Sequence, residues 1–169
     1  MIKPLWEPYE IEKYYVPSNH EKEIIYFTKK TNPKDYPNIV SHLEKYREIM
    51  DERRENLQGK LKFYHLHWPR DDYFFEKGPK ILGVRKCQIP TFSYTEEEAY
   101  VMMAMNVIKC NRVNQKYLTA LLNSKLIAFW LRHKGKMQGF QYQVDKEPLV
   151  DLPLITSNDE DLFESLVDY

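Results

Sequence analysis

Hydrophobic positions repeat with a helical period in two parts of the chain. In the first part, apolar side chains recur four, three and four residues apart, at Ile39, Leu43, Tyr46 and Met50. This spacing places them on one face of a helix, which we expect over residues 36–56. A wider apolar face follows Asn114, a residue type that commonly caps helices. It predicts a second helix over residues 114–133, before Gly135.

Outside these helices the hydrophobic residues form short runs bounded by turn-forming residues. Such runs are predicted to be strands, and they cover residues 23–28, 80–85, 87–94, 99–104, 106–110 and 140–144. Strands spaced this closely favour hairpins or a mixed sheet over βαβ units. The predicted fold class is therefore mixed α/β (α+β), with a twisted, mostly antiparallel or mixed sheet flanked by the two helices.

The length of the chain suits one ordinary domain with a substantial core, which we assign to residues 1–156. Residues 157–169 are typical of the first turns of a following helix, in which Asn158 or Asp159 caps the start and acidic residues favour the first turn. Little sequence remains after these turns. We therefore expect the chain to be a fragment of a larger protein.

The composition of the chain excludes several functional classes. Lysine and arginine together number 25, as do aspartate and glutamate, which excludes a strongly basic, non-specific nucleic-acid binder but allows segregated charge. Cys87 and Cys110 form no metal-binding or redox pattern, so a reduced, cytoplasmic protein is expected. The longest apolar stretch, residues 118–131, contains polar residues and is too short to cross a bilayer, which indicates no membrane partner.

The segment "FYHLHWPRDDYFFEKGPK", residues 63–80, carries side chains that could bind a metal ion. His65 and His67 would share one face of a strand, and Asp72 and Glu76 follow them. The spacing matches no known metal motif, so we expect no metal site and keep a metal-dependent nuclease only as an alternative. The sequence also lacks a nucleophile elbow, a phosphate-binding loop and a dinucleotide motif. We therefore predict no catalytic residue and no cofactor site in this chain.

Cations gather at three places along the chain. They are Arg70 beside Trp68, then Arg85 with Lys86, and then Arg132, Lys134 and Lys136 at the end of the second predicted helix. Glutamines follow the third group, at positions 138, 141 and 143. Arginine, lysine and glutamine bind phosphates and base edges, so the pattern favours nucleic-acid binding, with a protein-interaction module as the alternative.

The order of the motifs is similar to that of a known family. "YPNIVSHLEKYREIMDERRE", "KLKFYHLHWPRD", "FFEKGPKI" and "YLTALLNSKL" follow one another along the chain. From about Ile2 to Leu154 it resembles the TaqI-like C-terminal specificity domain of adenine-specific DNA methyltransferases and fused type II restriction-modification enzymes. The resemblance implies a target recognition domain for double-stranded DNA. It also implies a catalytic methyltransferase domain in the same parent chain, which would bind S-adenosylmethionine. That domain's Asn-Pro-Pro-Tyr signature is absent here.

The resemblance also implies roles for individual residues. The DNA-binding residues that it suggests are Arg70, Arg85, Lys86, Gln88, Lys134, Lys136, Gln138 and Gln141. Trp68 and Pro69 are expected to structure a loop. Where many relatives carry a Glu or Gln before the Trp-Pro step, this chain has His65 and His67. These positions either change with the DNA sequence that a family member recognises or pack against other residues of the domain. A recognition subunit of a multi-subunit restriction system is a further alternative, which would carry two such regions joined by coiled coils.

Overall fold

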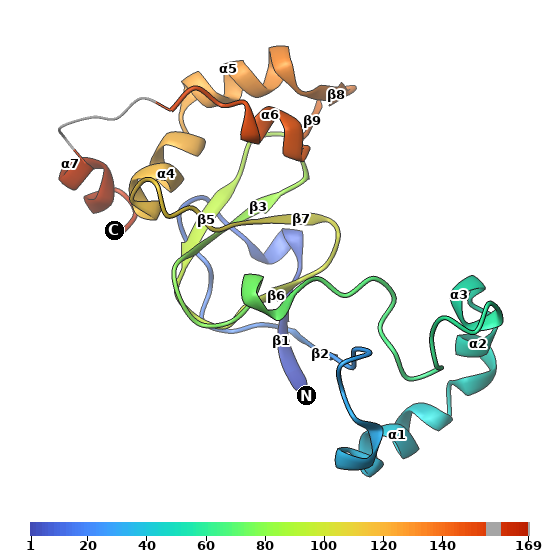
Figure 1. Cartoon of the computed structure of the whole chain (residues 1–169). Coiled ribbons are helices and arrows are strands. Elements are labelled where there is room, and N and C mark those ends of the chain that lie inside the picture. The colour runs from blue at the N-terminus through green and yellow to red at the C-terminus, as the bar shows by residue number, and fades with distance from the viewer. Residues whose placement is uncertain (155–159, 169) are drawn as a thin grey trace. The chain divides into compact units, whose positions relative to one another are not determined.

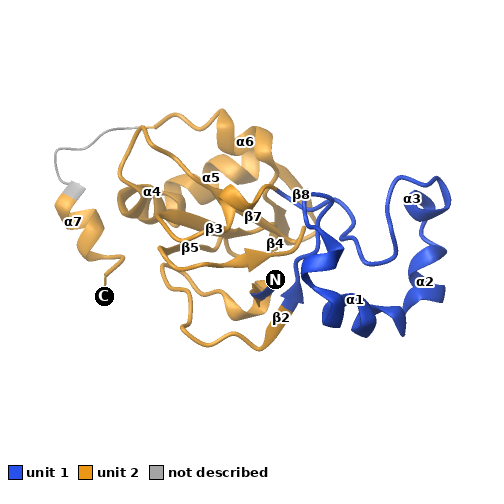
Figure 2. Cartoon of the chain, turned by 60° about the horizontal axis from the view of Figure 1, so that its bottom comes forward, with its two compact units in different colours: residues 1–3, 24–70 blue, residues 4–23, 71–169 orange. Residues whose placement is uncertain are grey.

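The computed structural model describes residues 1–154 and 160–168 (Figure 1). The chain divides into two compact units, shown in Figure 2. The first comprises residues 1–3 and 24–70, and the second comprises residues 4–23 and 71–169. Strands β1 (Ile2–Trp6) and β2 (Lys22–Ile25) each contribute residues to both units.

The first unit is helical where the sequence predicts a helix, but it contains three short helices instead of one. They are α1 (Pro37–Glu44), α2 (Arg47–Asp51) and α3 (Arg54–Leu57), preceded by the 3-10 turn η2 (Pro33–Asp35). The single helix predicted over residues 36–56 is therefore wrong. The break before α3 lies at Arg53, which has an extended backbone and whose Nε donates to the carbonyl oxygen of Met50 at 3.0 Å. The same carbonyl oxygen also accepts from the backbone nitrogens of Glu52 and Arg53, so several donors converge on the end of α2.

Arg53 also holds the segment that follows the helices. Its two Nη atoms donate to the carbonyl oxygens of Lys62, Phe63 and His65 at 3.0–3.3 Å. Phe27 is fully buried nearby in the same unit, with the rings of Tyr64 and His65 centred 5.1 and 6.2 Å from its own. One guanidinium thus organises the segment in which the sequence places two histidines.

The second unit is built on an antiparallel sheet in the order β5-β3-β7. Its strands are β3 (Lys80–Val84), β5 (Phe92–Thr95) and β7 (Met105–Ile108), and every residue of β3 is buried. A second antiparallel sheet has the order β4-β9-β8, with β4 (Lys86–Cys87), β8 (Lys136–Gln138) and β9 (Gln141–Gln143). The short β6 (Tyr100–Val101) pairs in parallel with β1, and η1 (Pro8–Glu10) and η3 (Asp72–Phe74) are 3-10 turns. The predicted mixed α+β class is confirmed.

The second predicted helix is interrupted in the middle. Asn114 caps α4 (Gln115–Leu122) as expected, since its side chain accepts from the backbone nitrogens of Lys116 and Tyr117. The chain then breaks at Asn123 and resumes as α5 (Lys125–Lys134), capped by Ser124. The buried amide of Asn123 donates to the carbonyl oxygen of Phe92 at 2.7 Å and accepts from its nitrogen at 3.0 Å. A side chain that bonds the backbone of another element competes with helix continuation, so one helix over residues 114–133 is the wrong prediction.

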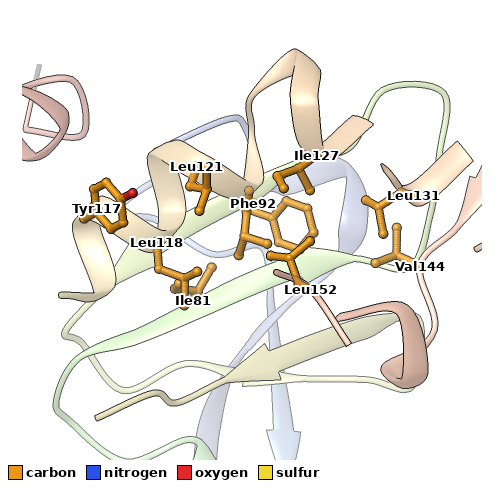
Figure 3. Close-up of a cluster of buried hydrophobic side chains, with 10 residues drawn as sticks. Ile81, Phe92, Tyr117, Leu118, Leu121, Ile127, Leu131, Val144 and Leu152 are labelled. Atoms are coloured by element: carbon orange, nitrogen blue, oxygen red, sulfur yellow. The ribbon is translucent and has the colours of Figure 1, made fainter. Parts of the chain in front are cut away.

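The hydrophobic core of this unit lies between the two helices and the β5-β3-β7 sheet (Figure 3). Phe92 and Ile81 face the helices from the sheet, and Leu121, Ile127 and Leu131 face Phe92 from the helices. Tyr117, Leu118, Leu122, Val144 and Leu152 complete the cluster. The helices α6 (Lys146–Val150) and α7 (Glu160–Ser165) follow. The predicted final helix corresponds to α7, but its proposed caps, Asn158 and Asp159, lie outside the described residues.

Candidate nucleic-acid interface

One face of the small sheet β4-β9-β8 carries only lysine and glutamine side chains. Lys86 pairs with Gln143, which pairs in turn with Lys136, and Gln141 pairs with Gln138. Directly paired residues share a face of a sheet, and alternate residues along a strand return to it. We call this surface the Lys/Gln face, defined by Lys86, Lys136, Gln138, Gln141 and Gln143.

The opposite face of the same sheet is directed inward. It is formed by Cys87, Tyr142 and Met137, which are each partly buried, and Cys87 and Tyr142 pack against the hydrophobic core. All members of the Lys/Gln face except Gln143 are exposed. The alternation along these short strands therefore fixes which side chains meet solvent.

A chain of polar contacts supports the Lys/Gln face from one side. Arg85 Nη2 donates to Asp145 Oδ1 at 2.8 Å, and Asp145 Oδ2 accepts from Gln143 Nε2 at 2.8 Å. Gln143 Oε1 then accepts from Gln138 Nε2 at 2.6 Å. The hydrogen bond from Arg85 is the main reason that the pKa of Asp145 is lowered. The Asp145 carboxylate at the base of this chain accepts from Gln143, and Gln143 in turn orients Gln138.

Arg85 is half-buried and bound by other residues of the protein, whereas Lys86 and Gln88 are exposed. Besides Asp145, its guanidinium donates to the carbonyl oxygen of Met103 at 3.2 Å. Lys86 and Gln88 are exposed on and just after β4. Because their side chains are exposed, Lys86 and Gln88 could contact DNA, as the resemblance implies, without breaking bonds within the protein. For Arg85, DNA contact stays a prediction.

Strands β8 and β9 form a hairpin that follows α5 (Figure 1). Its two-residue turn is Gly139–Phe140, and Gly139 has φ +61°. Phe140 does not share the positive φ, so the turn has glycine at its first position as type II′ turns require. Lys134 ends α5 just before the hairpin, with Nζ 5.8 Å from the ring centroid of Trp130. The hairpin thus brings Lys134, Lys136, Gln138 and Gln141 close together in the chain.

Arg70, Trp68 and Pro69 belong to the first unit, whereas the residues of the Lys/Gln face belong to the second. The carbonyl oxygen of Arg70 accepts a hydrogen bond from the hydroxyl of Tyr26. Trp68 is 72% exposed with φ +56°, an unusual conformation for a bulky residue. This backbone places its ring edge-on to His67, with centroids 5.6 Å apart. The loop role predicted for Trp68 and Pro69 stays a prediction.

The two histidines of the same segment have partners within the first unit. Nδ1 of His65 accepts from the backbone nitrogen of Lys62 at 3.0 Å, so this ring nitrogen is unprotonated. Burial, together with the charges of Lys29, Arg53 and Lys62, lowers the pKa of His65. His67 Nε2 lies 3.0 Å from Glu55 Oε2. Among the described residues, no three His, Cys, Asp or Glu side chains are grouped to hold a metal ion.

Two other expectations concern the whole chain. Both cysteines, Cys87 and Cys110, are free thiols. In the part of the chain that the structure describes, every helix is too short or too polar to span a bilayer.

The chain is an α+β protein whose small β4-β9-β8 sheet exposes lysine and glutamine side chains. Comparison with known proteins gives the family: the TaqI-like C-terminal specificity domain matches residues 10–154, and the chain belongs to this family. The chain is 25% identical over 145 residues to the type II methyltransferase M.HincII of Haemophilus influenzae, across 80% of the chain and 27% of that protein. The predicted resemblance is thus confirmed.

A solved structure is similar to almost the whole chain in fold. It is that of the type IIL restriction-modification enzyme MmeI in complex with DNA, with a TM-score of 0.66, 13% identity, and coverage of 99% of this chain and 22% of that one. The chain therefore spans about a quarter of the length of either relative.

Sequence reasoning named Gln143 without assigning it to the site, and it gave no role to Asp145 or Phe140. Gln143 lies on the same face as Gln141 because strand side chains alternate, so a strand over residues 140–144 already implies it. Asp145 follows β9, and only the fold brings it to Arg85. Phe140 was placed inside the predicted strand, whereas it occupies the hairpin turn. The Gly139–Phe140 step was the available indication, since glycine commonly begins such turns.

Proposed function

We propose that the chain is the target recognition domain of an N6-adenine DNA methyltransferase or methyltransferase-endonuclease, and that it reads a sequence in double-stranded DNA. The observation that carries the proposal is the Lys/Gln face, an exposed sheet surface of two lysines and three glutamines in a member of this family. Lysine binds phosphate groups, and glutamine can make two hydrogen bonds to adenine in the major groove.

The members of the surface would divide these tasks. Lys86, Lys134 and Lys136 would bind phosphates and set the register on the duplex, as would Arg70 in the first unit. Gln138, Gln141 and Gln88 would contact base edges. Arg85 would act through Asp145 as a positioning residue, because its guanidinium is already engaged by a carboxylate and a carbonyl oxygen.

The proposed partners are duplex DNA and a catalytic methyltransferase domain in the same parent chain. S-adenosylmethionine would be bound by that domain, which would also supply part of the attraction to phosphate. If the catalytic domain supplies part of the attraction to phosphate, the recognition domain can have as many acidic as basic residues. DNA binding depends on local charge and on the number of phosphates neutralised, not on the net charge of one domain.

Selection from a random duplex library tests this proposal. The chain should enrich one short sequence, and its affinity for that sequence should exceed that for a scrambled duplex of equal length. Lys86→Ala and Lys136→Ala should each weaken binding to both duplexes. Each variant should also lower the slope of log affinity against log salt by about one phosphate contact.

Lys125→Ala is the matched control, because Lys125 is exposed in the same unit at the opposite end of α5 from Lys134. It should leave both affinity and slope unchanged. Failure to enrich any sequence, with the two face variants binding as the control does, would instead indicate a protein-interaction module.

A further inference from the structure

Phe140 is the most exposed of the large hydrophobic residues in the described part of the chain. Its side chain is 93% exposed, at the tip of the β8–β9 hairpin. No ring contact within the described residues joins it to another aromatic side chain. An aromatic side chain carries a large apolar surface that water solvates poorly, so its presence at this position calls for an explanation.

The fold does not account for a phenylalanine at this position. A type II′ turn needs glycine at its first central position, and Gly139 supplies it. The second position accepts most residues, and small or polar ones are common there. The core of the unit is also independent of Phe140, because the hairpin packs inward through Tyr142. Neither the turn nor the core explains the ring.

The position of Phe140 relative to the Lys/Gln face suggests its role. Gln138 and Gln141 flank the turn as its paired residues, so the ring extends beyond the two glutamines at the free end of the hairpin. A two-stranded ribbon fits the major groove of DNA. The tip of an inserted ribbon approaches the base edges, and the flanking lysines remain near the phosphates.

We propose that Phe140 contacts the C5-methyl group of a thymine in the major groove, beside an adenine that Gln138 or Gln141 reads. This inference rests on the proposed function and adds a residue and a chemical group to it. An A·T pair presents the adenine N6 and N7 atoms and the thymine methyl group along one groove edge. A glutamine that binds adenine therefore leaves an apolar methyl group within the same groove, and a phenyl ring is complementary to it.

Replacing single thymines by deoxyuridine in the selected duplex tests the contact, because uracil lacks only the methyl group. At one position the wild-type chain should bind about fourfold more weakly, the value for one buried methyl-sized group at about 0.8 kcal/mol. Phe140→Ser should bind the thymine and uracil duplexes equally. Phe140→Leu should keep part of the preference, since an apolar side chain remains.

The control is Phe129→Ser, which replaces an exposed phenylalanine on α5 of the same unit, whose ring is tilted against that of His133 with centroids 4.2 Å apart. It should retain the wild-type preference for thymine. Circular dichroism of Phe140→Ser should match that of the wild type, because the replaced side chain is almost wholly in solvent.

Three results would overturn the inference while leaving sequence recognition intact. They are equal binding of every uracil duplex by the wild type, an undiminished thymine preference in Phe140→Ser, and an enriched target without A·T pairs. A fluorescent 2-aminopurine step that unstacks with the wild type but not with Phe140→Ser would also overturn it, in favour of a wedge between base pairs. If no sequence is enriched at all, the proposed function fails, and the inference fails with it.

Discussion

Arg85 Nη2 lies 2.8 Å from Asp145 Oδ1, so the residue before β4 is bound to the residue that follows β9 by two positions. Asp145 in turn accepts from Gln143, and Gln143 accepts from Gln138. The Arg85–Asp145 ion pair thus holds two amide groups of the Lys/Gln face in place. The orientation of a glutamine amide decides which base edge it can hydrogen-bond. The Arg85–Asp145 pair should therefore affect which DNA sequence the chain prefers.

Arg85→Ala and Lys86→Ala should separate positioning from phosphate binding. Arg85→Ala frees Asp145 and lets the glutamines reorient, so the affinity ratio between the selected duplex and a scrambled one should fall several-fold, with the salt slope unchanged. Lys86→Ala should leave the ratio near its wild-type value and lower the slope by about one contact. Fluorescence anisotropy titrations over a salt series measure both quantities. A lower salt slope for Arg85→Ala would assign Arg85 to direct phosphate contact.

Asn123 should be among the most stabilising polar residues of the second unit. Its buried amide accepts from the backbone nitrogen of Phe92 and donates to its carbonyl oxygen, which also accepts from the nitrogen of Tyr14. Asn123→Ala therefore leaves one buried N–H without a partner, and the free energy of unfolding should fall by about 1–3 kcal/mol. Urea denaturation gives this value, with the exposed Asn111→Ala as the control. Equal midpoints for the two variants would contradict the role given to Asn123.

His65 should make the first unit sensitive to mild acid. Its folded-state pKa lies below the usual 6.5, mainly because of burial, so the unfolded chain binds a proton first as the pH falls. The free energy of unfolding should therefore decrease as the pH drops below about 6.5. His65→Asn keeps an acceptor for the Lys62 nitrogen without a titrating group, and it should lessen this decrease. Thermal unfolding between pH 5 and about 7.5 compares the two proteins, and identical profiles would contradict the prediction.

Lys80 should produce the same trend, a rise of stability with pH, in the alkaline range. Its fully buried ammonium group donates to the carbonyl oxygens of Glu76, Gly78 and Glu97. Burial, with a smaller effect of Lys109, lowers its pKa from 10.5 to about 8. The unfolded chain holds this proton more tightly, so stability should rise between about pH 8 and about pH 10.5, by roughly 3 kcal/mol at most.

Lys80→Met removes the titrating group and isolates this contribution from that of other residues. The difference in unfolding free energy between the wild type and Lys80→Met should grow in favour of the wild type across the same pH range. Parallel curves would show that the ammonium group keeps its usual pKa.

The elements of the fold were largely predictable, and their interruptions were not. Local sequence patterns located the helical regions, the cap at Asn114 and most strands, because these depend on neighbouring residues. They did not predict β1 or β8, and the single strand predicted over residues 87–94 is divided between β4 and β5. The breaks at Arg53 and Asn123 arise from side chains that bond the backbone of distant segments, namely residues 62–65 and Phe92. No local pattern contains that information.

The candidate site shows the same division. The lysines and glutamines near residues 134–141 stood out by type, and the resemblance supplied their expected role. Their arrangement depends on strand register, which brings Lys86 across from Gln143 although the two lie far apart in the sequence. The support from Asp145 has the same long-range origin. His65 and His67 first suggested metal ligands, but the structure pairs them with Lys62 and Glu55.

The most direct test of sequence-specific DNA recognition is a competition titration of the chain between its selected duplex and a scrambled duplex as salt increases. The proposal predicts that affinity for both falls with salt, while the selected duplex stays preferred by about a thousandfold or more. Equal affinities for the two duplexes at every salt concentration, or no salt-dependent binding to either, would contradict the proposal.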